Sequence, residues 1–220
     1  MLPVFKRLGG NIGQYLLQTI LITENGNRWM NDLINILQSY AAISDEEIEG
    51  VANIAEYKRY GKNEYIFTPN TVCNHIFIMT KGLVRCFYLY DDKEINLRLL
   101  CEHSAVIAYS SYIQQTKTEE FVQTIESSEG YIISRKHIEK LSETVPVINQ
   151  LKLQTAERHY ISMERRLLTI QYKTAEERLR YFMKVMEPGI VERTPAIHIA
   201  SYLGMPPESL SRAKRKLNKC

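Results

Sequence analysis

The C-terminal end of the chain contains a short polar helix whose side chains suit recognition of nucleic acid. Over residues 207–217 the leucines at 210 and 217 lie seven apart, so one helical face can pack while the other stays polar. The polar positions carry carboxylate, hydroxyl, guanidinium and ammonium groups, at Glu208, Ser209, Ser211, Arg212, Lys214, Arg215 and Lys216. Such groups can hydrogen-bond base edges or phosphates in a major groove.

A second helix precedes this one closely. Ile197, Ala200 and Leu203 are expected on one face of a short helix, Gly204 supplies the turn, and Pro207 begins the polar helix. Its apolar side would then pack back on the first helix. This is the outline of a helix-turn-helix, with a small residue at the close contact and a glycine in the turn. The alternative is a plain helical hairpin with a solvated basic face.

The charge of the chain is distributed unevenly. The 220 residues carry a net charge of +3, but residues 145–220 hold 14 Lys and Arg against 7 Asp and Glu, a net +7. The first 144 residues hold 14 basic and 18 acidic groups, a net −4. This asymmetry is typical of a nucleic-acid-binding unit attached to a neutral or acidic partner domain.

A long helix is predicted from Pro146 onward, because proline is favoured in the first turn of a helix. Apolar residues follow at alternating spacings of three and four, the pattern of a coiled-coil seam, at Leu153, Ala156, Tyr160, Met163, Leu167 and Ile170. The seam predicts a contact between two copies of the helix. The alternative is a helix packed on its own domain.

Two capping boxes mark the starts of further helices. Ser44–Glu47 opens a short helix after a helix that begins near Met30, and Thr174–Glu177 opens another that must stop at Pro188. The apolar positions of the first helical stretch are Leu33, Ile34, Leu37, Tyr40 and Ala41, and those of the helix after Thr174 are Leu179, Phe182, Met183 and Met186.

Between about residues 58 and 134 the apolar period changes to two. Several β-branched and aromatic runs are separated by turn-forming stretches, which predicts a sandwich or small barrel of short strands. Gly82 stands between two such runs, where a tight hairpin requires a positive φ.

Several classes of protein are disfavoured. The four cysteines form no CxxC pair and the five histidines form no HxH or HExxH motif, so neither a metal nor another cofactor is expected. An enzyme is the weakest reading, because no converging set of catalytic or metal-binding side chains is visible. No apolar run is long enough to span a membrane, and residues 14–22 make a poor signal peptide, so a cytoplasmic protein is expected.

The segment IASYLGMPPESLSRAKRKL, preceded by a long helix and a β-rich region containing KGLVR, resembles the Crp/Fnr family of bacterial transcription regulators. The resemblance covers residues 30–218. It implies a cyclic-nucleotide-binding-like β-roll, a dimerisation helix and a winged-helix DNA reader. It also implies that Glu208 and Arg212 contact bases. We expect Ser209 to face bases too, and the remaining polar residues of the helix to contact phosphates or flank it.

The sequence departs from the family pattern in three places. Pro206 cannot provide a side-chain oxygen to cap the polar helix over residues 207–217. The missing cap lowers the stability of that helix by about 1 kcal/mol. Little sequence follows that helix for a full wing. The third departure is in the ligand pocket, whose degenerate positions fall near Ala108, Thr118 and Glu119. A phosphate would meet Glu119 and Glu120 there instead of an arginine, so binding of cyclic AMP is not expected.

The sequence thus predicts an α+β protein. Its expected parts are an N-terminal extension (1–29), an antiparallel β-roll sensor (30–144), a dimerisation helix (145–171) and a helix-turn-helix DNA-binding domain (172–220). The expected partners are double-stranded DNA and a second copy of the chain. RNA polymerase is a further candidate partner, any small-molecule effector is unknown, and no membrane is expected. The rival from another class is a small-ligand sensor whose C-terminal helices bind a protein.

Overall fold

The computed structural model describes residues 33–39, 42–172 and 174–217. Three expected features lie outside these residues. They are the N-terminal extension, the helix start at Met30, and the apolar helix positions Tyr40 and Ala41. Residues 33–39 are helical, and Leu33 and Leu37 are buried as predicted. Helix α3 (Asp45–Ala52) follows, and the predicted capping box is confirmed: Ser44 Oγ accepts from the Glu47 backbone, and the Glu47 carboxylate accepts from the Ser44 backbone.

The β-rich region forms two four-stranded antiparallel sheets. One has the order β1-β8-β3-β6 and the other β2-β7-β4-β5. The strands are β1 (Glu56–Tyr60), β2 (Tyr65–Phe67), β3 (His75–Lys81), β4 (Val84–Tyr90), β5 (Lys93–Leu100), β6 (Ser104–Val106), β7 (Phe121–Thr124) and β8 (Ser128–Ser134). The inner faces of the sheets enclose a core that includes Phe77, Met79, Val84, Val106 and Val122.

The turns between strands carry the residues that the turn geometry demands. Gly82 has a φ of 126° between β3 and β4, as predicted, and a Cβ there would lie 2.2 Å from Ser128 Oγ. Asp91 and Asp92 both have positive φ at the tip of the β4–β5 hairpin. Consecutive positive φ angles match the right-handed twist of the strands, which makes this a tight hairpin.

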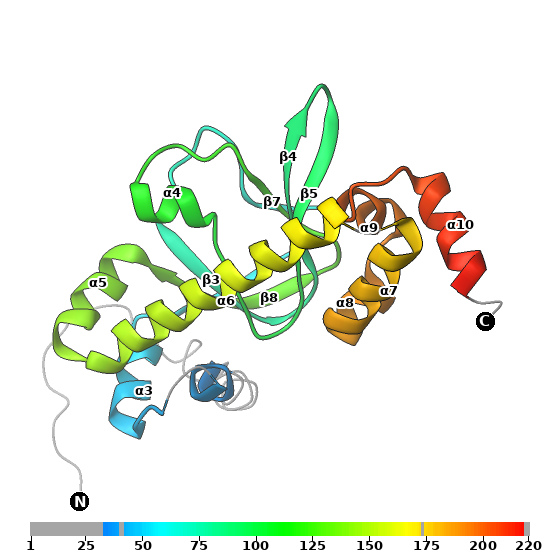
Figure 1. Cartoon of the computed structure of the whole chain (residues 1–220). Coiled ribbons are helices and arrows are strands. Elements are labelled where there is room, and N and C mark those ends of the chain that lie inside the picture. Colours follow the sequence, from blue (N-terminus) through cyan, green and yellow to red (C-terminus); the bar gives the residue numbers. More distant parts are fainter. Residues whose placement is uncertain (1–32, 40–41, 173, 218–220) are drawn as a thin grey trace, which may run out of the picture.

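Short helices and one long helix flank the sheets. Helix α4 (Tyr109–Gln114) lies between β6 and β7, and α5 (Arg135–Thr144) follows β8. Helix α6 (Pro146–Tyr172) begins at the predicted proline and runs across the β-roll to the C-terminal helices (Figure 1). A separate core joins residues 33–39, α3, α5 and the start of α6 to β8, through residues such as Leu37, Val51, Ile133 and Ile148.

The C-terminal unit consists of four helices, with no strand over residues 174–217. They are α7 (Ala175–Val185), α8 (Pro188–Arg193), α9 (Ala196–Tyr202) and α10 (Pro207–Leu217). The capping box of α7 is confirmed, and α7 stops before Pro188 as predicted. Pro188 also begins α8, which the sequence reading missed. Met183 was expected on the apolar face of α7 but is 53% exposed, whereas Leu179 and Phe182 are buried and Met186 packs partly against the same core.

Among the described residues, Cys73, Cys86 and Cys101 are buried free thiols. No group of three or more metal-binding side chains occurs in this part of the chain. None of its helices combines the length and the apolar character that a membrane crossing requires.

Candidate nucleic-acid interface

The turn between α9 and α10 is built on Gly204. Its φ of 62° lies in the left-handed region, and a backbone hydrogen bond runs from Gly204 to Ser201, at 3.1 Å. A second bond runs from Met205 N to Ala200 O, at 3.0 Å. This pair of bonds is a Schellman motif, which satisfies the last carbonyl groups of a helix and reverses the chain. The turn that the sequence predicted is therefore present.

The apolar seam between the two helices is close to the predicted one but is not identical. Ala200, Leu203 and Leu210 are at most 1% exposed and pack together. Ile197 was expected in this seam and is 61% exposed, whereas Ile199 is buried. The expectation for Ile197 was wrong because Ile199, four residues before Leu203, shares its face of the helix, and Ile197 lies almost opposite.

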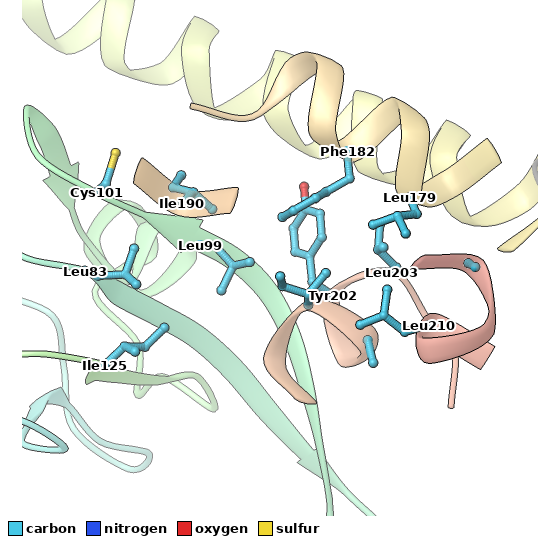
Figure 2. Close-up of a cluster of buried hydrophobic side chains, with 13 residues drawn as sticks. Leu83, Leu99, Cys101, Ile125, Leu179, Phe182, Ile190, Tyr202, Leu203 and Leu210 are labelled. Atoms are coloured by element: carbon cyan, nitrogen blue, oxygen red, sulfur yellow. The ribbon is translucent and has the colours of Figure 1, made fainter. Parts of the chain in front are cut away.

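This core extends beyond the two helices. Leu179 and Phe182 of α7 and Ile190 of α8 complete it from the C-terminal unit. Leu83, Leu99, Cys101 and Ile125 enter it from the β-roll, as Figure 2 shows. The helix pair thus packs on the β-roll through a continuous hydrophobic core.

The opposite side of α10 is polar and accessible. Glu208, Ser211, Arg212, Lys214 and Arg215 are exposed. Their side chains therefore share the solvent-facing surface of one helix, as the sequence predicted.

Three of the polar residues of α10 have partners on the chain itself. Ser209 is half-buried and its hydroxyl accepts a hydrogen bond from Arg212 Nη2 at 3.2 Å. Ser209 therefore helps to orient Arg212. Lys216 forms an ion pair with Glu176 of α7, so its ammonium group is directed toward α7.

Two prolines stand at the start of α10. Pro206 precedes the helix, and its carbonyl accepts from Ser209 N at 3.0 Å. Pro207 occupies the first helical position, where no backbone N–H is needed. The fixed φ of proline compensates in part for the missing cap.

Arg178 of α7 holds the turn in place, and the sequence reading missed it. Its guanidinium donates to the carbonyl of Leu203 at 3.0 Å, to that of Gly204 at 3.3 Å, and to that of Ile170. It thus links the end of α9 to the end of α6. No local pattern could have indicated this role, because the acceptors lie up to 26 residues away.

Replacing Arg178 by methionine should destabilise the C-terminal unit. Methionine retains the apolar stem but cannot donate to the three carbonyl groups, and hydrogen bonds to charged groups contribute about 1.5 to 3 kcal/mol. The measurement is the urea dependence of the circular dichroism. Arg180→Met, on an exposed position of the same helix, is the control. Equal unfolding midpoints for the two variants would contradict the capping role.

The first helix of the pair is also tied to the β4–β5 hairpin. Ser201 Oγ accepts from Asn96 N at 2.9 Å and donates to Glu94 O at 2.7 Å. Arg166 of α6 donates to Asn96 O at 2.8 Å. Strand β5 is therefore hydrogen-bonded to both α9 and α6.

A charged cluster lies beside this contact. Arg85 forms an ion pair with Glu94, and its Nη1 is 3.2 Å from Nδ1 of His198 in α9. Burial, and then the Arg85 charge, lowers the pKa of His198, so the neutral ring can accept from the guanidinium. Arg85 is the arginine of the KGLVR stretch.

Helix α8 makes a second polar contact with the β-roll. Arg193 forms ion pairs with Glu102 and Glu126. Cys101 Sγ donates to the Glu187 carboxylate at 2.8 Å. Together with the shared core, these contacts fix the orientation of the helix pair on the β-roll.

The predicted seam on α6 is solvent-facing in the single chain. Leu153, Tyr160 and Leu167 are 59%, 67% and 55% exposed. The other seam residues, Ala156, Met163 and Ile170, are half-buried. An apolar stripe thus runs along the helix without being covered by the chain's own described residues.

The degenerate pocket of the β-roll contains a buried ion pair. Arg98 of β5 donates to the carboxylate oxygens of Glu120 at 2.9 and 3.1 Å and to Ile107 O at 2.7 Å. Both side chains are 6% exposed. The Arg98 guanidinium is already paired with the Glu120 carboxylate. An added phosphate would therefore have to displace that carboxylate or be repelled by it.

Of the three pocket residues predicted, two are buried and one is not. Ala108 precedes α4, and Thr118 Oγ1 accepts from Glu120 N at 3.0 Å. Glu119 is exposed. Of the two carboxylates expected to meet a phosphate, Glu120 is the inward one, because neighbouring residues of extended chain face opposite sides.

The comparisons with known proteins agree with this architecture. Residues 57–145 match the family model of the cyclic nucleotide-binding domain. The chain therefore has a domain of cyclic-nucleotide-binding type, followed by helices. No functionally curated protein matches the sequence significantly.

Solved structures of transcription regulators share this fold, so the fold that the resemblance implied is confirmed. FixK2 from Bradyrhizobium japonicum is 20% identical, with a TM-score of 0.66, over 76% of this chain and 85% of that one. The c-di-GMP responsive global regulator CLP from Xanthomonas campestris is 18% identical, with a TM-score of 0.64, over 80% and 92%. A CooA variant from Carboxydothermus hydrogenoformans is 20% identical, with a TM-score of 0.62, over 77% and 79%.

Proposed function

We propose that this chain is a transcription regulator that binds a two-fold symmetric DNA site as a homodimer, without control by cyclic AMP. The observation that carries the proposal is the exposed polar face of α10, held on a buried helix-turn-helix core. Glu208, Ser209 and Arg212 would read bases, and Ser211, Lys214 and Arg215 would contact phosphates. The regulator would act in the cytoplasm, where its DNA lies.

The exposed stripe of α6 supports the homodimer. A seam of alternating spacings of three and four is the geometry by which two helices pack in parallel, knobs into holes. In a symmetric dimer the two α10 helices would enter successive major grooves about 34 Å apart. A palindromic site is the expected consequence. A role for RNA polymerase as a partner belongs to the same proposal.

Titration with cyclic AMP is expected to give no binding at micromolar concentrations. The Glu120 carboxylate is buried beside the position that a phosphate would occupy, and Arg98 is already paired with it. Isothermal titration calorimetry of the full chain makes the measurement. Saturable micromolar binding that is lost in Arg98→Met would contradict the prediction.

In vitro selection from a random DNA pool, with no effector added, tests the proposed function. The parent protein should enrich a two-fold symmetric sequence. Its affinity for any DNA should also fall steeply with salt, because Lys and Arg contacts to phosphate release counterions. Failure to enrich any sequence, together with a salt-insensitive interaction, would instead favour a protein partner for the C-terminal helices.

A further inference from the structure

One carboxylate faces the cations of the proposed DNA-binding helix. Glu176, in the first turn of α7, forms an ion pair with Lys216 in the last turn of α10. The Glu176 carboxylate also lies within electrostatic range of Arg212, which stands one helical turn before Lys216. A negative charge from α7 therefore borders the cationic face that we expect to meet DNA.

Buried apolar contacts hold α7 and α10 side by side. Leu179 of α7 and Leu210 and Ala213 of α10 are at most 2% exposed and belong to one core. Leu217, the last residue of α10, packs partly against the same core. The start of α7 is thereby kept beside the end of α10, so the ion pair follows from the packing of the two helices.

The start of α7 does not require the Glu176 carboxylate. Thr174 and Glu177 already form the capping box, in which the Glu177 carboxylate accepts from Thr174 N at 2.8 Å. The side chains of Glu176 and Lys216 are 31% and 72% exposed, and an exposed ion pair contributes little to folding because water screens it. Helix capping and fold stability therefore do not account for a carboxylate at this position.

The Glu176 carboxylate is charged at neutral pH. The hydrogen bond from Lys216 lowers its pKa below the ordinary value, and the charges of Lys216 and Arg212 lower it further. This fixed negative charge repels a phosphate that approaches the same ammonium group. Because Glu176 already neutralises Lys216, a phosphate that displaces the carboxylate gains little from the release of counterions there.

Lys216 differs in this respect from the other cations of α10. Lys214 and Arg215 are exposed and form no ion pair with the part of the chain that the structure describes. Arg212 is hydrogen-bonded to the uncharged hydroxyl of Ser209. The side of α10 that faces α7 is therefore neutralised, whereas the rest of its cationic surface is not.

We propose that Glu176 competes with DNA phosphates for Lys216 and thereby limits the affinity of α10 for DNA of any sequence. Contacts to phosphate carry no sequence information, so the competition weakens binding to all sites alike. Non-specific sites are in large excess in a genome, and a lower affinity for them shortens the time that a regulator spends there. Glu176 is thus a positioning residue that acts through Lys216. The inference rests on the proposed function.

Glu176→Gln tests the competition, because glutamine keeps the shape of the side chain and removes its charge. The dissociation constant for a random-sequence duplex should fall by about eightfold in 0.1 M salt, because one more phosphate contact adds about 0.9 to the exponent of the salt dependence. The slope of log K against log salt concentration should become steeper by about one. Fluorescence anisotropy at several salt concentrations measures both quantities.

Two further variants separate a local contact from a change in net charge. Glu192→Gln removes an exposed carboxylate of α8 and changes the net charge equally, and it should leave the salt slope unchanged. In a Lys216→Gln background, Glu176→Gln should lose most of its effect, which a double-mutant cycle measures. Circular dichroism of each variant verifies that it is folded.

The same titrations with heparin give a readout that does not depend on DNA recognition. Glu176→Gln should bind this polyanion more tightly, and with a steeper salt dependence, than the parent or Glu192→Gln. Equal salt slopes for the parent and Glu176→Gln, or an undiminished effect in the Lys216→Gln background, would overturn the proposal. A parent protein that binds heparin but no DNA would contradict the proposed function and leave the heparin test intact. Failure of the parent to bind either polyanion would overturn both.

Discussion

Leu167→Asp should convert the proposed dimer into a monomer and abolish tight binding to a symmetric DNA site. Leu167 lies in the exposed stripe of α6 and is 55% exposed in the single chain. In a two-fold seam the variant would place two carboxylates close together in an apolar contact. Burying an unpaired charge costs several kcal/mol, so the dissociation constant of the dimer should rise by about a hundredfold or more.

Sedimentation equilibrium makes this measurement, since the single chain has a mass of 25.6 kDa. Ser162→Asp is the matched control, because it introduces the same charge at an exposed position on the other side of the same helix. The control should remain dimeric. A parent protein that sediments as a monomer, or a Leu167→Asp variant that stays dimeric, would refute the assignment of the seam.

Arg212→Ala should relax the DNA sequence preference of the parent protein. Arg212 is exposed on α10 and is oriented by Ser209, so it is available for a bidentate contact to guanine. Such a contact contributes about 1 to 3 kcal/mol of discrimination. That corresponds to about 5- to 150-fold per half-site. In a dimer both half-sites are affected, so the loss should compound.

Selection from a random pool and anisotropy titrations on the selected site measure this effect. Lys214→Ala is the comparison, because it removes an exposed cation from the same helix. It should weaken binding to all sequences alike and reduce the salt slope by about one. If Arg212→Ala also weakens all sequences alike, Arg212 is a phosphate contact and not a reading residue.

The parts of the fold that the sequence predicted are those with local signals. The capping boxes at Ser44 and Thr174, the glycine turns at Gly82 and Gly204, and the proline start of α6 each depend on a few adjacent residues. The backbone geometry at these places follows from which side chains tolerate it. The helix-turn-helix was predictable for the same reason.

The missed elements depend on contacts between distant residues. Strand β1 has no alternating apolar pattern, and four of its five residues are exposed. It forms because its backbone pairs with β8, about 70 residues later. Strand β6 has only three residues and pairs with β3. A short or polar strand of this kind has no signature without its neighbour.

The sequence predicted which residues of the site are exposed on α10, but not the contacts that hold α9 and α10 in place. The exposed residues of α10 follow from helical periodicity. The roles of Arg178 and Ser201 do not, because their partners are carbonyl and amide groups from other elements. The inward position of Glu120, and not Glu119, depends on the register of the chain as it enters β7.

The core that joins the β-roll to the C-terminal helices limits how the chain can be divided. Leu99 and Ile125 of the β-roll are buried against residues of α7 to α10. A fragment that begins at α7 would expose that contact surface to water, and the β-roll alone would expose the other half. Helices α7 to α10 should therefore not fold stably when fused to an unrelated sensor domain by a linker alone. Such a chimera also needs a complementary apolar surface on the sensor. The two parts should also melt together in a single calorimetric transition.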